Sequence, residues 1–298
     1  MPMIGRVWGM AVAAAFLVAA AAAADETVHH DQLFDEGKLL ATGGVSQVEG
    51  AGGGGLVPWA LITGYGTQDG VGINAHGTYV GLSDFTLWTE GVAVGLFDRL
   101  EVSYARQSFD TGEAGARLGL GKGFTFDQDI IGAKVRLFGD AVFDQDGWIP
   151  QVSAGLQYKM NDRGDIIRAI GGRHDSGTDY YLAASKLFLA ERVLVNATLR
   201  ETEANQYGIL GFGGGNGGYS TQFEGSAAFL LTRSIALGAD YRTKPDNLKF
   251  AKEDDAFDLF AAWFINKNLS LTLAYADLGD IALQGRQDGA YMSLQVGF

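Results

Sequence analysis

Repeated stretches of alternating apolar and polar residues most strongly constrain how this chain can fold. In the last stretch, every second residue from Ala290 to Phe298 is apolar, and the residues between them are mostly polar. Successive side chains of a strand point to opposite faces, so the stretch predicts a strand with one apolar and one polar face. Similar stretches, each roughly the length of a tilted strand that crosses hydrocarbon, lie at 131–137, 152–158, 193–199, 223–231, 235–241 and 269–275.

Alternation alone also fits a soluble sandwich, so the aromatic residues and the connections decide between the two folds. Aromatic residues stand at both borders of the apolar stretches, as the two membrane interfaces require: Tyr158, Tyr241 and Tyr275 on one side, and Phe138, Phe188, Trp263 and Phe298 on the other. Short turns at 97–99, 189–191, 232–234 and 266–268 alternate with long polar or glycine-rich segments at 110–125, 161–177, 202–220, 244–255 and 277–288. Short turns on one side and long loops on the other are typical of an outer-membrane barrel.

The predicted fold is therefore all-β, a transmembrane antiparallel up-and-down β-barrel. Strands near 71–82 and 85–96, followed by ten more, give a count of about 12. The stretch Ala60–Thr67 leaves an alternative open: it is either a further strand in a 14-stranded count or a segment at the mouth or inside the lumen.

The first 24 residues indicate export. Arg6 precedes an uninterrupted apolar or small run from Val7 to Ala24, which ends in alanines before Asp25. This arrangement is typical of a cleaved signal peptide. The predicted organisation is a signal peptide over 1–24, a periplasmic N-terminal segment or lumen plug over 25–58, and an outer-membrane barrel over 59–298. The predicted location is the cell outer membrane.

Composition excludes several other classes of protein. The net charge of −13 argues against a nucleic-acid partner, because phosphates require a basic face. The chain has no Cys, which removes disulfides and Cys-ligated zinc. The glycine-rich run Gly50–Gly55 is followed by Leu56 and Val57, and lacks the Lys and Ser/Thr of a phosphate-binding loop. We therefore expect no cofactor and no metal.

Several separated blocks together resemble a known family. They are LLATGGVSQVEGAGGGGLVPWALITGYG at 39–66, GVAVGLFDRLEVSYAR at 91–106, GAKVRLFGDAVFDQD at 132–146, GILGFGGG at 208–215, YRTKPDN at 241–247 and MSLQVGF at 292–298. The mature chain from about Leu39 resembles an uncharacterised family of proteobacterial outer-membrane β-barrel proteins, classed as a domain of unknown function. The resemblance implies the barrel, and it supplies no catalytic or binding residues. The ending at Phe298 also resembles the C-terminal outer-membrane targeting signature of such barrels.

If the apolar faces contact lipid, charged side chains of both signs line the lumen. The predicted lumen-lining residues are Glu101, Lys134, Arg136, Lys159, Lys186, Arg200, Glu224, Asp240, Arg242 and Asp258. Such charges set the selectivity of channels. The first functional hypothesis is therefore a narrow, porin-like channel for small hydrophilic solutes.

Two alternatives remain open. A closed structural or surface-interaction barrel would carry the same wall without transport. An outer-membrane hydrolase is motivated only by the adjacent His174, Asp175 and Ser176, and adjacency in sequence is not triad geometry, so we expect no enzyme activity. The expected partners are outer-membrane lipid and lipopolysaccharide, the barrel-assembly machinery and small solutes.

Overall fold

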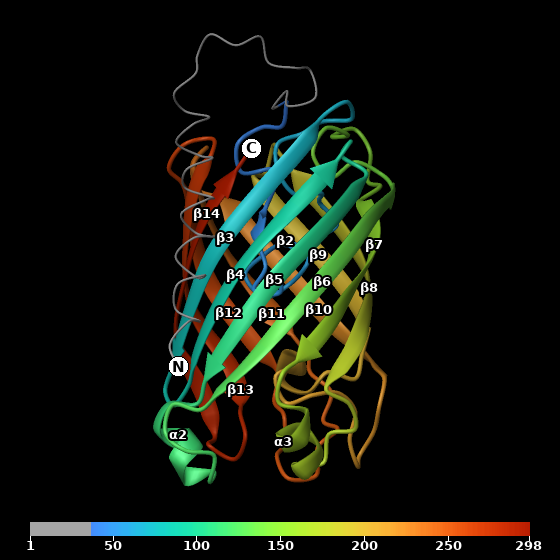
Figure 1. Ribbon diagram of the computed structural model, residues 1–298. Helices are drawn as coiled ribbons and strands as arrows, with labels where there is room; N and C mark the ends of the chain where they lie inside the picture. Colours follow the sequence, from blue (N-terminus) through green and yellow to red (C-terminus); the bar gives the residue numbers. More distant parts are fainter. Residues whose placement is uncertain (1–36) are drawn as a thin grey trace.

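Twelve antiparallel strands form one closed ring in the computed structural model, which describes residues 37–298 (Figure 1). The predicted signal peptide lies outside the described residues. The wall consists of β3 (Val71–Leu82), β4 (Thr86–Leu96), β5 (Leu100–Asp110), β6 (Thr125–Phe138), β7 (Gln151–Asn161), β8 (Ser176–Phe188), β9 (Val193–Thr202), β10 (Ser220–Leu230), β11 (Ile235–Arg242), β12 (Ala256–Phe264), β13 (Leu269–Asp280) and β14 (Arg286–Gly297). The predicted 12-stranded all-β barrel is confirmed.

The ring closes where the last strand pairs with the first. Residues of β14 pair with β3 from Gly289 opposite Leu82 to Gly297 opposite Asn74. Phe298 continues this seam, because its N–H donates to the carbonyl of Ile73 at 2.8 Å, and its own carbonyl accepts from the N–H groups of Ile73 and Tyr65. Each wall strand therefore has a partner on both sides, as hydrocarbon requires.

The alternation predicted from the sequence separates the two faces of this wall. Apolar side chains such as Val102, Ile131, Leu182 and Leu259 point outward and are exposed, whereas the intervening residues are mostly buried. Tyr158, Tyr241, Tyr275, Phe138 and Trp263 are also exposed on the outer surface. An apolar outer band with aromatic borders is the surface of a transmembrane barrel.

The two ends of the barrel differ in their connections. At the short-turn end lie the tight turns 97–99, 189–192, 231–234 and 265–268, together with the longer connection 139–150 and the C-terminus (Figure 1). The long-loop end carries 111–124, 162–175, 203–219 and 243–255, which include the short helices α2 (Gly112–Arg117) and α3 (Gly164–Ala169) and the 3-10 turn η3 (Asn205–Gly208). Within residues 37–298 no helix is long and apolar enough to cross a bilayer.

The structure differs from two predictions made from the sequence. The predicted loop 277–288 shrinks to 281–285, because β13 and β14 extend above the apolar band through an irregular register between Asp277 and Asp280. Polar residues at a strand end therefore do not always mark a loop. The stretch Ala60–Thr67 is not a wall strand, so the 14-stranded alternative is wrong; its residues 60–66 are buried inside the ring.

The outer band makes a testable prediction at Leu259, which is 58% exposed and lies between Phe257 and Trp263 on β12. Leu259→Arg places a charge in hydrocarbon and should lower the free energy of unfolding by about 2–4 kcal/mol in lipid vesicles, measured by urea titration. The matched control Leu283→Arg lies in the turn between β13 and β14, where the side chain is 66% exposed, and should change it by less than about 0.5 kcal/mol. Equal effects at the two positions would contradict the placement of the membrane.

Candidate functional site

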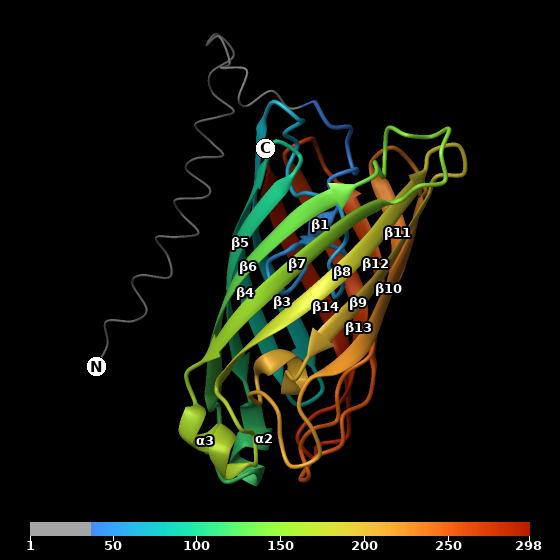
Figure 2. The same cartoon turned by 90° about the vertical axis from the view of Figure 1, so that its right-hand side faces the viewer.

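The lumen is filled by the segment that precedes the first wall strand. We call residues 38–66 the plug; they include the short strand pair β1 (Val45–Ser46) and β2 (Gly52–Gly53). From Val45 to Gly66 every plug residue is buried. In Figure 2 this blue segment runs inside the ring of strands. Any path for a solute along the barrel axis must therefore pass the plug.

Lumen-facing side chains form hydrogen bonds with the backbone N–H and C=O groups of the plug. Glu101 of β5 accepts hydrogen bonds from the N–H groups of Gly52, at 2.9 Å, and Thr63, at 2.8 Å. Lys134 of β6 lies 3.0 Å from Glu101 and donates to the carbonyls of Gly52, at 3.0 Å, and Trp59, at 3.1 Å. A buried irregular backbone needs such partners, because unpaired N–H and C=O groups are costly in a dry interior. The polar wall thus serves as the hydrogen-bonding surface for the plug.

The plug's Glu49 is the centre of a buried ion network. Its carboxylate contacts Lys159 of β7, lies 2.6 Å from Nη1 of Arg242 on β11, and lies 3.9 Å from Nη2 of Arg200 on β9. Two wall carboxylates hold the same cations: Asp179 lies 2.7 Å from Lys159 and 3.2 Å from Arg200, and Glu224 lies 3.0 Å from Arg242. Three wall strands, β7, β9 and β11, therefore contact one side chain of the plug, and β8 and β10 between them supply the acids that hold the cations.

The electrostatic balance of this network keeps Glu49 ionised. Burial alone would raise the pKa of Glu49, but the positive charges of Arg242, Lys159 and Arg200 together hold it well below its usual range. The three cations face the three anions Glu49, Asp179 and Glu224, so the cluster is neutral as a whole. A buried charge is tolerated when it is paired and hydrogen-bonded in this way.

A second group of acids touches the tip of the plug without a cation. Asp240 of β11 and Asp258 of β12 are directly opposite in the sheet, and both are buried. Asp240 Oδ2 accepts the N–H of Leu56 at 2.8 Å, whereas Asp240 Oδ1 and Asp258 Oδ2 have no hydrogen-bond partner among the described residues. Gly54 and Gly55 permit this approach, because a Cβ on either would lie only 2.5 or 2.8 Å from a carboxylate oxygen.

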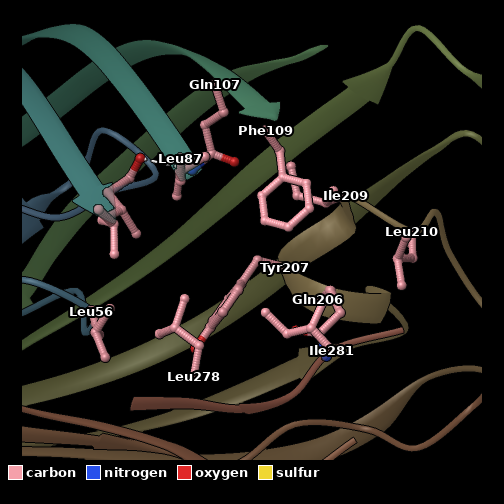
Figure 3. A pocket seen from close by; sticks show the side chains of 12 residues that line it. Leu56, Leu87, Gln107, Phe109, Gln206, Tyr207, Ile209, Leu210, Leu278 and Ile281 are labelled. Atoms are coloured by element: carbon pink, nitrogen blue, oxygen red, sulfur yellow. Dashed lines mark hydrogen bonds between the residues drawn. The ribbon is translucent and has the colours of Figure 1, made fainter. Parts of the chain in front are cut away.

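An apolar layer fills the lumen between the plug and the long loops. Leu56 of the plug, Leu87 and Phe109 of the wall, and Leu278 and Ile281 line one cavity in this layer (Figure 3). Val48 of the plug lines the same cavity. The cavity has a volume of about 30 Å³. Its mostly apolar walls supply too few polar partners to hold an ordered water. The outer part of the lumen is therefore closed by apolar contacts in addition to the plug.

Residues 204–212, which we call the lid, fold from the β9–β10 loop onto this layer. The lid's Gln206 and Tyr207 have positive φ values of 44° and 61°. This backbone conformation is strained for residues other than glycine. Tertiary contacts hold it: the Gln206 N–H donates to both carboxylate oxygens of Glu253, and the Tyr207 carbonyl accepts from Lys159 at 3.1 Å.

The residues predicted to line the lumen point into the barrel. All are buried except Arg136, which is partly exposed and pairs with Asp98 and Asp140 at the short-turn end. Glu101 and Lys134 bind the plug backbone; Lys159, Arg200, Glu224 and Arg242 form the Glu49 network; Asp240 and Asp258 contact the plug tip. Lys186 instead donates to backbone carbonyls of the 139–150 connection.

Sequence reasoning missed the two acids Glu49 and Asp179. Glu49 precedes the glycine run in a segment without alternation, so no pattern marked it as an interior residue. Asp179 lies near the start of β8, two residues after the predicted loop 161–177, in a strand for which the sequence showed no clear alternating stretch. One signal was available in the sequence. All the predicted lumen-lining residues from Lys134 to Arg200 are basic, which indicates that further acids must lie near them in the interior.

The structure does not join His174, Asp175 and Ser176 into a catalytic arrangement. In the described part of the chain, no hydrogen bond connects their side chains; Asp175 contacts Arg168 at 3.4 Å. The backbone of His174 pairs with Phe212 of the lid. His174 thus joins its loop to the lid through the backbone, and this geometry offers no support for a hydrolase.

The chain belongs to the family described as "Protein of unknown function (DUF3034)", whose profile matches residues 42–295. The match covers both the plug from Thr42 onward and the wall. It confirms the predicted resemblance to an uncharacterised family. A sequence search of curated proteins finds no match.

Solved structures with a similar fold include barrels of the outer membrane. The KdgM porin has 8% identity over 76% of this chain and 99% of its own, with a TM-score of 0.48. The NanC porin has 11% identity over 76% and 97%, with a TM-score of 0.44. The outer membrane phospholipase A from Escherichia coli has 12% identity over 79% and 94%, with a TM-score of 0.41. Likenesses at this level carry no information about function.

The Glu49 network makes a prediction about stability. Glu49→Gln leaves three buried cations facing only two acids and should lower the free energy of unfolding by about 3–5 kcal/mol, because an uncompensated charge remains in the interior. The measurement is urea unfolding of the folded barrel in detergent. Glu191→Gln, in the exposed β8–β9 turn, is the control and should have no measurable effect. A Glu49→Gln protein as stable as the wild type would contradict the stabilising role of the Glu49 network.

The lid contact makes a prediction about pH. Burial raises the pKa of Glu253 from 4.5 to about 7, and burial lowers the pKa of its neighbour Lys244, whose Nζ lies 3.9 Å away. A closed lid thus binds the Glu253 proton more tightly than an open one, in which the pKa would be 4.5. Closure should therefore strengthen as the pH falls from 7 towards 4.5 and weaken as it rises.

Hydrogen exchange of the lid amides, corrected for intrinsic rates, tests this sign. Protection should be about ten- to a hundred-fold greater near pH 5 than near pH 8. Glu253→Gln keeps the shape of the side chain and removes its titration, so the gain in protection towards low pH should be lost in this variant. An unchanged pH dependence in that variant would exclude Glu253 as the titrating group.

Proposed function

We propose that this protein is an outer-membrane barrel that is closed at rest and becomes a narrow channel for small hydrophilic solutes when the plug moves. The observation that carries the proposal is the way the plug is held. Glu49 and the plug backbone are bound by polar and charged wall side chains. Plug residues such as Val45, Leu56 and Trp59 also pack in an apolar cluster with the wall. The polar contacts can be exchanged for contacts with water and solute when the plug moves.

The chemistry of the wall supports passage of hydrophilic solutes once the plug leaves. Vacating the plug would expose charges of both signs, among them Lys134, Arg200, Glu101 and Asp258. Charged side chains that line a pore set its selectivity. In the closed state Lys134 and Glu101 bind the plug and Arg200 is paired within the Glu49 network, so the resting protein should not conduct.

A permanently closed barrel is the second candidate, and the lid favours it. The apolar layer joins Leu56 of the plug to Phe109 and Leu278 of the wall and to the lid, so the outer part of the lumen is closed by more than the polar contacts of the plug. A passage for hydrophilic solutes therefore requires the lid to move as well as the plug. If neither moves, the protein serves as a structural or surface-interaction barrel that presents its long loops.

The outer rim supports the expected contact with lipopolysaccharide headgroups. At the long-loop end, the outward-facing hydroxyls of Tyr104 and Tyr275 each donate to an Asp at 2.7 Å, and Tyr241 does the same with Asp255. Tyrosines with an apolar ring and a wet hydroxyl mark a membrane interface. We place the polar headgroups of the outer leaflet at this level, with the short turns in the periplasm.

Planar-bilayer recording separates the two candidates. The wild-type protein should be silent at low voltage. Glu49→Ala combined with Glu101→Ala removes the Glu49 ion pairs and the hydrogen bonds between Glu101 and the plug backbone. This double variant should produce discrete conductance steps. Glu191→Gln is the control and should behave as the wild type. Each protein is first shown to be folded by its heat-dependent mobility on detergent gels.

Two outcomes count against the proposed gated channel. Steady conductance of the wild type would mean that the plug does not seal the lumen. A folded double variant that stays silent in repeated reconstitutions would favour the permanently closed barrel.

A further inference from the structure

We propose that Lys159, Arg200 and Arg242 form a carboxylate-binding site, which Glu49 occupies in the closed barrel and which takes the carboxylate of a small anionic solute when the plug leaves. The solute step rests on the proposed function, because a solute reaches these residues only in an unplugged barrel. The binding chemistry itself stands on the geometry around Glu49. We call Lys159, Arg200 and Arg242 the cationic nest.

The nest binds both oxygens of the carboxylate from different sides. Lys159 contacts Oε1 of Glu49, while Nη1 of Arg242 lies 2.6 Å from Oε2 and Nη2 of Arg200 lies 3.9 Å from it. Gln47 of the plug donates a further hydrogen bond to Oε2 at 2.5 Å. Several charge-assisted donors around one carboxylate are a strong and directional recognition pattern. Two of the three hydrogen-bond donors, Lys159 and Arg242, belong to the wall and remain when the plug is gone, as does the nearby charge of Arg200.

Without Glu49, the wall residues of the ion network carry an excess of one positive charge. Its three cations are opposed by only two nearby acids, Asp179 and Glu224, which leaves a net charge of +1 in a buried position. An uncompensated buried charge is costly, so the vacated nest favours an anion. The two acids orient the cations: Arg200 contacts both, and Arg242 contacts Glu224. One carboxylate restores neutrality.

Among the neighbouring residues that the structure describes, the other cation near the nest is already engaged. The lid's Tyr207 covers Arg242, with the guanidinium carbon 4.3 Å from the ring centre, and Lys244 is engaged with Leu278, Gln206 and Glu253. Asp240 and Asp258 lie at the plug tip and contact no cation in the described part of the chain. The site should therefore select carboxylates over cations.

Chemical rescue tests the site in the full-length protein. Glu49→Ala removes a CH₂–COO⁻ group, for which acetate is the free equivalent. The variant should melt at a lower temperature than the wild type, and sodium acetate should raise its melting temperature in a concentration-dependent way, as expected for a ligand that binds the folded state. Sodium chloride at equal ionic strength and neutral acetamide should have no such effect. The wild type should not respond to acetate.

Two variants control for a general salt or cavity effect. Asp240→Ala also removes a buried carboxylate but leaves no unpaired cation, so acetate should not raise its melting temperature. Adding Arg242→Gln to Glu49→Ala should abolish the response. Acetate that stabilises Glu49→Ala no more than chloride does overturns the proposal. If Glu49→Ala does not fold in buffer, its folding yield with acetate against chloride is the readout, and equal yields overturn it.

The bilayer experiment keeps this inference distinct from the gated channel. In the Glu49→Ala/Glu101→Ala variant, glutarate serves as the small anionic solute. Its carboxylate should bind the vacated cationic nest and reduce the current, and adding Arg242→Gln should relieve that block. Rescue by acetate in a protein that never conducts would retain the site and reject the channel. Conductance without rescue and without block would retain the channel and reject the carboxylate site.

Discussion

Closure of the backbone hydrogen-bond ring is the constraint on which the rest of this structure depends. Hydrocarbon offers no partner to an N–H or C=O group, so each wall strand needs a neighbour on both sides. The seam between β14 and β3 completes the ring, and the carbonyl of Phe298 also binds the N–H of Tyr65 in the plug. The same closure that makes the wall stable in lipid therefore also attaches one end of the plug.

A closed ring creates an interior whose polar side chains must be satisfied without bulk water. The plug meets this requirement with its backbone, which binds Glu101 and Lys134, and with Glu49, which neutralises the cationic nest. Buried ion pairs add little net stability compared with apolar packing, but breaking one is costly. They are thus well suited to specify one position of the plug, and a competing anion of similar chemistry could replace Glu49.

The lumen is layered along its axis. A polar layer around the plug lies beneath an apolar layer, and the strained lid, whose Gln206 N–H is bound by Glu253, covers that apolar layer. The charged contacts of the plug and the apolar contacts that exclude water therefore lie at different depths of the barrel. We expect the plug and the lid to respond to different conditions, because different groups hold them.

The sequence by itself determined the kind of wall: alternation of period two, aromatic borders and connection lengths predicted a barrel of about 12 strands and left a 14-stranded count open, because strand geometry and the bilayer act on local patterns. The inward direction of residues such as Lys134 and Arg200 follows from the same alternation. Only the tertiary structure decided that 60–66 enter the lumen, that Glu49 meets the cationic nest, and that Gln206 adopts a strained backbone. These features join segments separated by up to about 200 residues, and no local periodicity records which distant charge a side chain will face.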